Sequence, residues 1–119
     1  RVGTIDLWVD WLSFHNMRPD EHKRYAEMMG IMRPWFLLIH SFSKTDHEYR
    51  AYKKAGGRGD ILPPNAPGVY RHFTDAKYIA HIFRHSFAVL ASRISKGYDD
   101  PLLPDKRVSD KLTVLLNIK

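Results

Sequence analysis

The sequence predicts an all-α fold, a small domain of four to six helices built around one long central amphipathic helix at residues 75–96. Within that segment the apolar residues recur at spacings of three and four, which places them on one face of a helix. They are Ile79, Ile82, Phe83, Phe87, Leu90 and Ile94. Thr74 and Asp75 favour a helix start, and Gly97 favours a helix end. No other segment offers a clear sheet for this stretch to join, so we expect a helical core.

The N-terminal part predicts two further helices. Residues 5–14 carry an apolar stripe at helical spacing, formed by Ile5, Trp8, Val9 and Leu12. Pro19 followed by two acids is typical of a helix start, because proline suits the first helical position and the acids suit the positive end of the dipole. The second helix should continue to Gly30.

Two segments follow in the middle of the chain. The apolar run at residues 35–39 fits either a buried helix or a short strand, and helix is the interpretation that agrees with the rest of the chain. Residues 45–48 have the spacing of a capping box, which predicts a helix ending at Gly56 and Gly57.

A Gly/Pro-rich extended linker at residues 56–68 separates two parts of the single expected domain, which spans residues 1–119. The part at 1–55 is neutral and rich in aromatic residues, and the part at 69–119 is basic. A last helix is expected at 105–116, although the composition of 112–118 also fits a strand.

The net charge of +6 lies in the second half of the chain. A basic half favours an acidic partner such as RNA, an anionic lipid or an acidic protein surface. The expected anionic-partner-binding residues are Lys53, Lys54, Arg58, Arg71, Lys77 and Arg84.

Large aromatic side chains crowd the first 36 residues, more than a small isolated domain needs to cover. Exposed aromatic groups of this kind usually mark protein contacts. The expected partner-binding residues are Trp8, Trp11, Phe14, Trp35 and Phe36. Of Trp8 and Trp11, one is expected to be buried only in an assembly.

No catalytic or cofactor signature stands out, so the sequence predicts a protein that is not an enzyme and needs no cofactor. His81 and His85 are four residues apart, a spacing that suits one metal ion, but only His72 is an obvious third ligand and we expect no metal site. The chain has no cysteine, which excludes thiolate chemistry and disulfides.

We therefore expect an accessory or structural subunit of a multiprotein assembly, with a mitochondrial inner-membrane complex of the respiratory chain or ATP synthase as the setting. The start at Arg1 is consistent with removal of a presequence. No apolar run reaches the roughly 18 residues of a membrane span, so membrane contact would be peripheral. The alternative is a small basic RNA-binding protein of ribosomal type.

Overall fold

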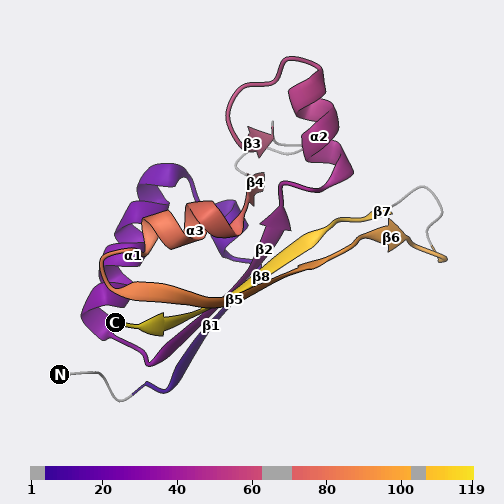
Figure 1. Ribbon diagram of the computed structural model, residues 1–119. Coiled ribbons are helices and arrows are strands. Elements are labelled where there is room, and N and C mark those ends of the chain that lie inside the picture. Colours follow the sequence, from indigo (N-terminus) through magenta and orange to yellow (C-terminus); the bar gives the residue numbers. More distant parts are fainter. Residues whose placement is uncertain (1–4, 63–70, 103–106) are drawn as a thin grey trace.

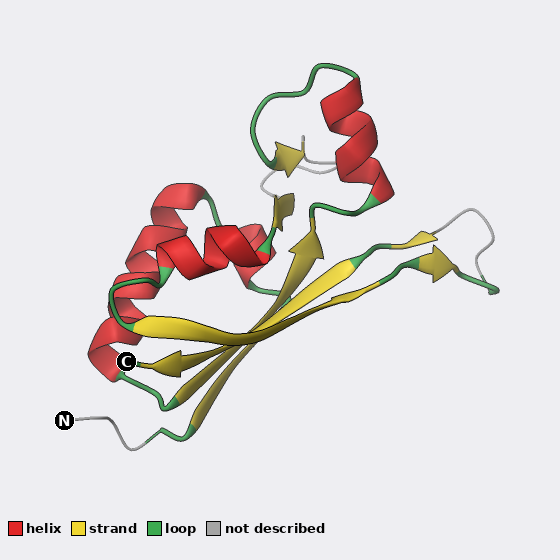
Figure 2. Ribbon diagram, in the orientation of Figure 1, coloured by secondary structure: helices red, strands yellow, loops and turns green. Residues whose placement is uncertain are grey.

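The computed structural model describes residues 5–62, 71–102 and 107–119, and it is a mixed α/β structure, so the all-α prediction is wrong (Figures 1 and 2). Its helical elements are η1 (Phe14–Asn16), α1 (Pro19–Met32), α2 (His47–Lys54) and α3 (Ala76–Ile82). Its strands are β1 (Leu7–Trp11), β2 (Phe36–Ser43), β3 (Ile61–Leu62), β4 (Arg71–Thr74), β5 (Phe87–Ser95), β6 (Tyr98–Asp99), β7 (Arg107–Val108) and β8 (Lys111–Ile118).

The strand β2 lies at the centre of the main sheet. Along one edge it pairs antiparallel with β8, from Phe36 opposite Asn117 to Phe42 opposite Lys111. Along the other edge it pairs parallel with β1 as far as His40, and then parallel with β4 from Phe42 onward. The sheet continues from β8 to β5, and β3 pairs with β4. Two strands therefore share one edge of β2, and β1 ends where β4 begins.

The helices α1 and α3 lie together on one face of this sheet, whereas α2 stands apart beyond the end of β2 (Figure 1). The main core forms between that face and the two helices. It contains alternate residues of β2 and β8 together with residues of η1, α1 and α3: Phe14, Tyr25, Met29, Leu37, Ile39, Ile79, Phe83, Phe87, Leu112, Val114, Leu116 and Ile118. A smaller cluster under α2 joins Tyr49, Leu62 and Phe73.

The expected central helix at residues 75–96 is instead a short helix followed by a strand. The helix α3 ends at Ile82, and residues 87–95 form β5, which pairs with β8. Spacings of three and four do not exclude a strand here, because residues 87–91 form a continuous apolar run, and the decisive pairing partner lies far along the chain. A β-bulge between Val89 and Ala91 shifts the register of β5 against β8.

Gly97, expected to end that helix, makes a close backbone approach after β5. A Cβ at this position would collide with the carbonyl of Val108. Its N–H donates to a carboxylate oxygen of Asp110 at 2.7 Å. Glycine is therefore required here for packing between two chain segments.

Three other expected helices are also strands. Residues 5–14 contain β1, and residues 36–39 of the apolar run belong to β2. Of the last expected helix at 105–116, residues 105 and 106 lie outside the described part of the chain, and the rest contains β7 and most of β8. In each case a strand, with side chains alternating between two faces, fits the residues as well as helical spacing does. Backbone hydrogen bonding to a neighbouring strand decides in favour of the strand. The strand alternative for residues 112–118 is confirmed.

Local signals did identify α1 and α2 correctly. In α1, Glu21 accepts a hydrogen bond from the backbone N–H of Arg18 at 3.2 Å, as a capping box requires. In α2, Asp46 caps the helix through the N–H of Glu48. The linker expected at 56–68 contains β3, and residues 63–70 lie outside the described part of the chain. The extent of the domain, 1–119, stays a prediction, without the helical description. None of the helices in the described ranges has the length and apolar character of a membrane span.

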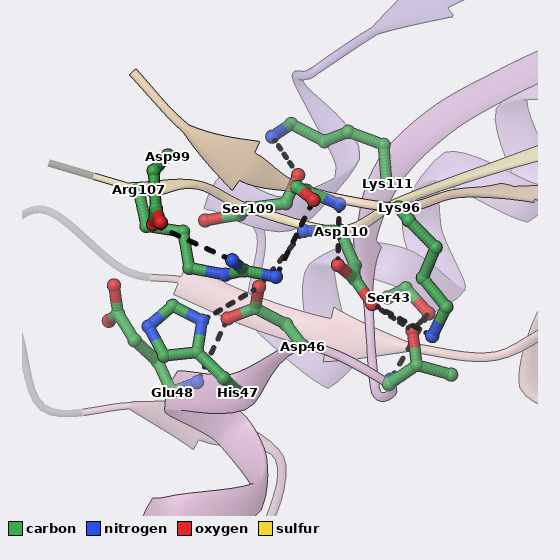
Figure 3. Close-up of polar contacts among 12 residues, drawn as sticks. Ser43, Asp46, His47, Glu48, Lys96, Asp99, Arg107, Ser109, Asp110 and Lys111 are labelled. Atoms are coloured by element: carbon green, nitrogen blue, oxygen red, sulfur yellow. Dashed lines mark hydrogen bonds and ion pairs between the residues drawn. The ribbon is translucent and has the colours of Figure 1, made fainter. Parts of the chain in front are cut away.

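Two buried aspartates connect the loops beyond the carboxyl end of β2 (Figure 3). Asp46 accepts from the N–H of Asp110 at 2.9 Å, in addition to capping α2. Asp110 accepts from Gly97 N–H, from the Thr45 hydroxyl at 2.7 Å, and from Lys96 Nζ at 3.3 Å. Burial alone would raise the pKa of Asp110, but these donors hold that pKa below its usual value. The carboxylates are thus fully engaged within the fold and act as structural ties.

Replacement of Phe87 by Ala should destabilise the protein by about 3–5 kcal/mol, because Phe87 is buried against Phe83 at the start of β5. The measurement is the free energy of unfolding in urea. Leu102→Ala is the matched control, since Leu102 is exposed and its truncation should change stability by less than about 0.5 kcal/mol. Equal effects of the two substitutions would contradict the assigned core.

Asp110→Asn should lower the free energy of unfolding by about 1–3 kcal/mol at pH 7, because it weakens several hydrogen bonds to a buried charge. The folded-state pKa of Asp110 is lowered, so its contribution is fully present above the unfolded value of about 3.9 and is lost as pH falls through the folded value. Wild type should therefore lose stability in acid more steeply than the variant. Asp99→Asn, which removes an exposed carboxylate 3.7 Å from Arg107, is the control and should keep the wild-type pH dependence.

Candidate functional site

The turn that follows β1 is fixed by a buried carboxylate. Asp10, on the side of β1 that faces the helices, accepts hydrogen bonds from the N–H groups of Ser13 and Phe14, both at 3.1 Å. Leu12 adopts a positive φ of 62°, and its N–H donates to the carbonyl of His40 at 2.8 Å. The chain therefore leaves the sheet abruptly at the carboxyl end of β1 and enters η1.

This turn places Phe14 against a buried histidine of α1. The rings of Phe14 and His22 stack with centroids 3.8 Å apart and an angle of 7° between their planes. His22 Nε2 lies 2.8 Å from the carbonyl oxygen of Phe14, and His22 Nδ1 lies 2.8 Å from the hydroxyl of Tyr78 on α3. A carbonyl oxygen can only accept, so Nε2 carries the proton. The Tyr78 hydroxyl consequently donates to the lone pair on Nδ1.

One more histidine joins this pair. His72 of β4 meets the His22 ring edge-on, with centroids 4.7 Å apart, and its centroid lies 5.2 Å from that of Tyr78. Within the described residues, the buried Nδ1 atom of His72 has no hydrogen-bond partner. Buried polar atoms are nearly always paired in native proteins, so this unpaired ring nitrogen beside His22 is a signal of function. We call His22, His72 and Tyr78 the histidine–tyrosine cluster. His15 of η1 also has an unpaired Nδ1, but its ring lies against Phe42, outside the cluster.

The cluster is uncharged near neutral pH. Burial lowers the pKa of His22, and it lowers the pKa of His72 to about 4, with the neighbouring His22 contributing. Burial also raises the pKa of Tyr78 to about 12, which keeps its hydroxyl protonated. The arrangement therefore presents neutral imidazole rings and a phenol that donates, which are groups suited to proton transfer.

A cleft of about 790 Å³ between α1 and α3 reaches this cluster. Tyr78 lines it together with Pro19 and Lys23 of the first part of α1. The rest of the lining is divided evenly between apolar residues and charged or polar ones: Ala26, Glu27, Gly30, Ile31, His81, Ile82, Phe83, Arg84, His85 and Ser86. Small-molecule sites are usually clefts that combine apolar side chains with polar groups that fix the orientation of the ligand.

The histidine pair on α3 considered for metal binding does not make a site. His81 and His85 are exposed, and Arg84 donates to the carbonyl of His81 at 2.7 Å. His72, the expected third ligand, is instead buried beside His22. Across the described ranges, no group of three or more potential ligands is arranged to hold a metal ion.

The expected partner-binding aromatics separate into two groups. Phe14 is completely buried and Trp8 packs against the core, so the prediction is wrong for Phe14, because it has no surface to offer a partner. Trp11, Trp35 and Phe36 are exposed. They remain candidates for a partner contact.

The expected anionic-partner residues do not form one surface. Lys53, Lys54 and Arg58 belong to α2 and the loop after it, whereas Lys77 and Arg84 belong to α3 and the turn that follows it, on separate parts of the molecule (Figure 1). Arg71 is occupied by an ion pair with Glu48 at 2.6 Å. Contact with RNA or lipid stays an untested prediction for these residues.

Most of the histidine–tyrosine cluster could not be predicted from the sequence, because its members come from three different elements. His22 and Tyr78, which are in direct contact, lie 56 positions apart. One local signal was available. His22 shares the buried face of α1 with Tyr25 and Met29, and a histidine on an apolar helix face needs a polar partner elsewhere in the fold.

Comparison with known proteins gives a likeness of fold. No protein family matches the sequence, and no curated protein matches it either. A solved structure described as "Conversion of a Disulfide Bond into a Thioacetal Group during Echinomycin Biosynthesis" is similar, with a TM-score of 0.60 and 13% sequence identity. The match covers 99% of this chain and 50% of that one, so this chain spans half the length of the similar protein.

These findings correct the functional prediction. A non-enzymatic structural subunit was inferred from the aromatic residues, the Gly/Pro-rich linker and the absence of a catalytic signature, but the α/β fold is shared with a protein described for a biosynthetic conversion. The assignment to a respiratory-chain or ATP synthase complex depended on that inference and is withdrawn, as is the ribosomal-type alternative. At 13% identity the chain resembles an enzyme in fold, and the reaction is stated for that protein alone.

Proposed function

We propose that this chain is part of an α/β enzyme that binds a small organic molecule beside the histidine–tyrosine cluster and transfers a proton to or from it. The observation that carries the proposal is the hydrogen-bonded chain from Tyr78 through His22 to the Phe14 carbonyl, which begins at a cleft. The mitochondrial location expected from the sequence remains a separate proposal, and it has no support in these contacts.

The position of the cluster supports this proposal. In open α/β sheets, ligands bind outside the carboxyl ends of the parallel strands. Phe14, whose carbonyl oxygen contacts His22, follows the carboxyl end of β1, and Tyr78 follows the carboxyl end of β4 by four residues. Along one edge of β2, β1 ends and β4 begins. This interruption of the pairing leaves room for side chains from η1, α1 and α3.

The protonation states define what the pair can do. A substrate that gives a proton to the Tyr78 oxygen would allow Tyr78 to pass its own proton to His22 Nδ1. His22 would then be an imidazolium whose Nε2–H still donates to Phe14. One O–H bond breaks and one forms on Tyr78, and one N–H bond forms on His22, so the relay leaves Tyr78 unchanged. Tyr78 is the group that touches substrate, and His22 is the acceptor behind it.

The buried surroundings keep His22 neutral and fixed in orientation. Burial lowers the pKa of His22, so Nδ1 is unprotonated at neutral pH, and Phe14 holds the ring in one orientation through both stacking and the hydrogen bond. A fixed tautomer is what a relay of this kind needs. The unpaired Nδ1 atom of His72 is a further polar group beside the pair.

Tyr78→Phe tests the pair with the removal of a single hydroxyl. Because that hydroxyl donates to the neutral form of His22, its loss should raise the pKa of His22. Histidine ¹⁵N NMR across a pH titration would measure this change and would show whether Nε2 carries the proton. Tyr52→Phe is the matched control, since its hydroxyl donates to the carbonyl of Arg58 on the α2 side of the molecule and should leave His22 unaffected.

Binding is tested with a library of small organic acids and amides, observed by amide NMR on the 119-residue chain. Compounds that shift the signals of Tyr78 and His22 should bind at least tenfold more weakly to Tyr78→Phe, and equally well to wild type and Tyr52→Phe. The proposed function would lose its basis if the compounds bound to Tyr78→Phe with the same affinity as to wild type. It would also lose its basis if NMR showed the Nδ1-protonated tautomer of His22.

A further inference from the structure

We propose that the bare face of the main sheet, together with the outer edge of β1, is an interface covered by a second α/β segment. That segment would add a parallel strand beside β1 and pack helices on the face opposite α1 and α3. This inference rests on the exposed surface of the sheet and is independent of the proposed proton transfer.

The bare face is apolar where β1 and β2 lie side by side. Leu7 and Val9 are each 49% exposed, Trp11 is 60% exposed, and Phe36 is 41% exposed. The pairing register sets Leu7 opposite Phe36 and Trp11 opposite His40, and the rings of Trp11 and His40 stack at 3.8 Å. No described helix covers this side of the sheet (Figure 2). A contiguous apolar area of this kind on a small protein usually marks a contact surface.

The same face becomes polar away from β1. On β8 it carries Lys111, Thr113 and Asn117, with Leu115 between them, and on β5 it carries Arg93 opposite Thr113. The side chains that require cover are therefore concentrated over β1 and β2. A partner that covers them would also reach past β1, beyond the present edge of the sheet.

The outer edge of β1 lacks most of the features that protect a natural sheet edge. Within the described residues β1 pairs with β2 alone, and no lysine, proline or bulge interrupts Leu7–Trp11. Its buried acid, Asp10, is directed inward and fixes the turn after the strand. Edge strands that stay free normally carry charges or breaks that prevent pairing. β1 instead has the composition of an interior strand.

The known geometry of parallel sheets identifies the occupant. β1, α1 and β2 form a parallel unit with its helix on one face, and parallel sheets occur almost only with both faces covered by helices. The similar structure contains as much chain again outside the match, since only 50% of it is covered. That length is sufficient for a strand and several helices. A second copy of this chain joined edge to edge would extend the sheet and leave the bare face open.

The experiment joins the 119-residue chain, through a Gly/Ser linker, to the half of the similar protein that lies outside the match. A linker raises the effective concentration, so that imperfectly matched surfaces still engage. Acrylamide quenching of Trp11 is measured in a background with Trp8 and Trp35 replaced by Phe, and β1 amide exchange is followed by NMR. We expect the joined half to reduce quenching at least threefold and to slow β1 exchange at least tenfold.

Val9→Lys should abolish both effects, because it places a charge in the covered area. Ser95→Lys, at an exposed position opposite Lys111 on the already polar part of the same face, should preserve them. The proposal is overturned if joining the half leaves Trp11 as accessible as in the free chain, or if the free chain already shields Trp11 by forming its own dimer, as measured by sedimentation. None of these readouts involves Tyr78, so they do not depend on the proposed function.

Discussion

The structure depends on the requirement that both edges of β2 find hydrogen-bonding partners. β8 satisfies one edge along its whole length, and β1 and β4 divide the other between them. The change from β1 to β4 forces the chain to leave the sheet at Leu12 and brings η1 over the end of the strand. From that single interruption follow the burial of Phe14, the orientation of His22 and the meeting of histidines from separate elements. The candidate site is thus a product of how one strand is paired.

Buried polar groups in this protein fall into two kinds. The carboxylates of Asp46 and Asp110 accept several hydrogen bonds each and hold loops together. The imidazoles of His15 and His72 each leave a buried ring nitrogen unpaired among the described residues. Leaving such a group unpaired costs stability, whereas a satisfied network adds to it. This difference in pairing distinguishes the two aspartates, which act as structural ties, from His72 of the candidate site.

The parts of the fold that the sequence predicted are those specified by local chemistry. Pro19 with its following acids and Asp46 with Glu48 mark true helix starts, because caps act within a few residues. The strands could not be predicted because the paired residues of β2 and β8 lie about seventy to eighty positions apart in the sequence. In addition, a largely apolar segment such as residues 87–95 fits both helix and strand periodicity until its pairing partner is known. The candidate site was hidden for the same reason. His22 and Tyr78 have no shared motif, and only the fold brings their atoms together.

The bulge in β5 has a further consequence for this sheet. Along a strand, successive side chains alternate between faces, and the extra residue at Leu90 reverses that phase for everything after it. With the bulge, Ile94 lies opposite Leu112 on the helix-bearing side, and Arg93 lies opposite Thr113 on the other. Without the bulge, Arg93 would lie on the helix-bearing side among buried leucines, and Ile94 would lie on the open side. The insertion or deletion of a single residue in this strand would therefore move the following side chains to the wrong face of the sheet. Such a change would be far more disruptive to the fold than most substitutions.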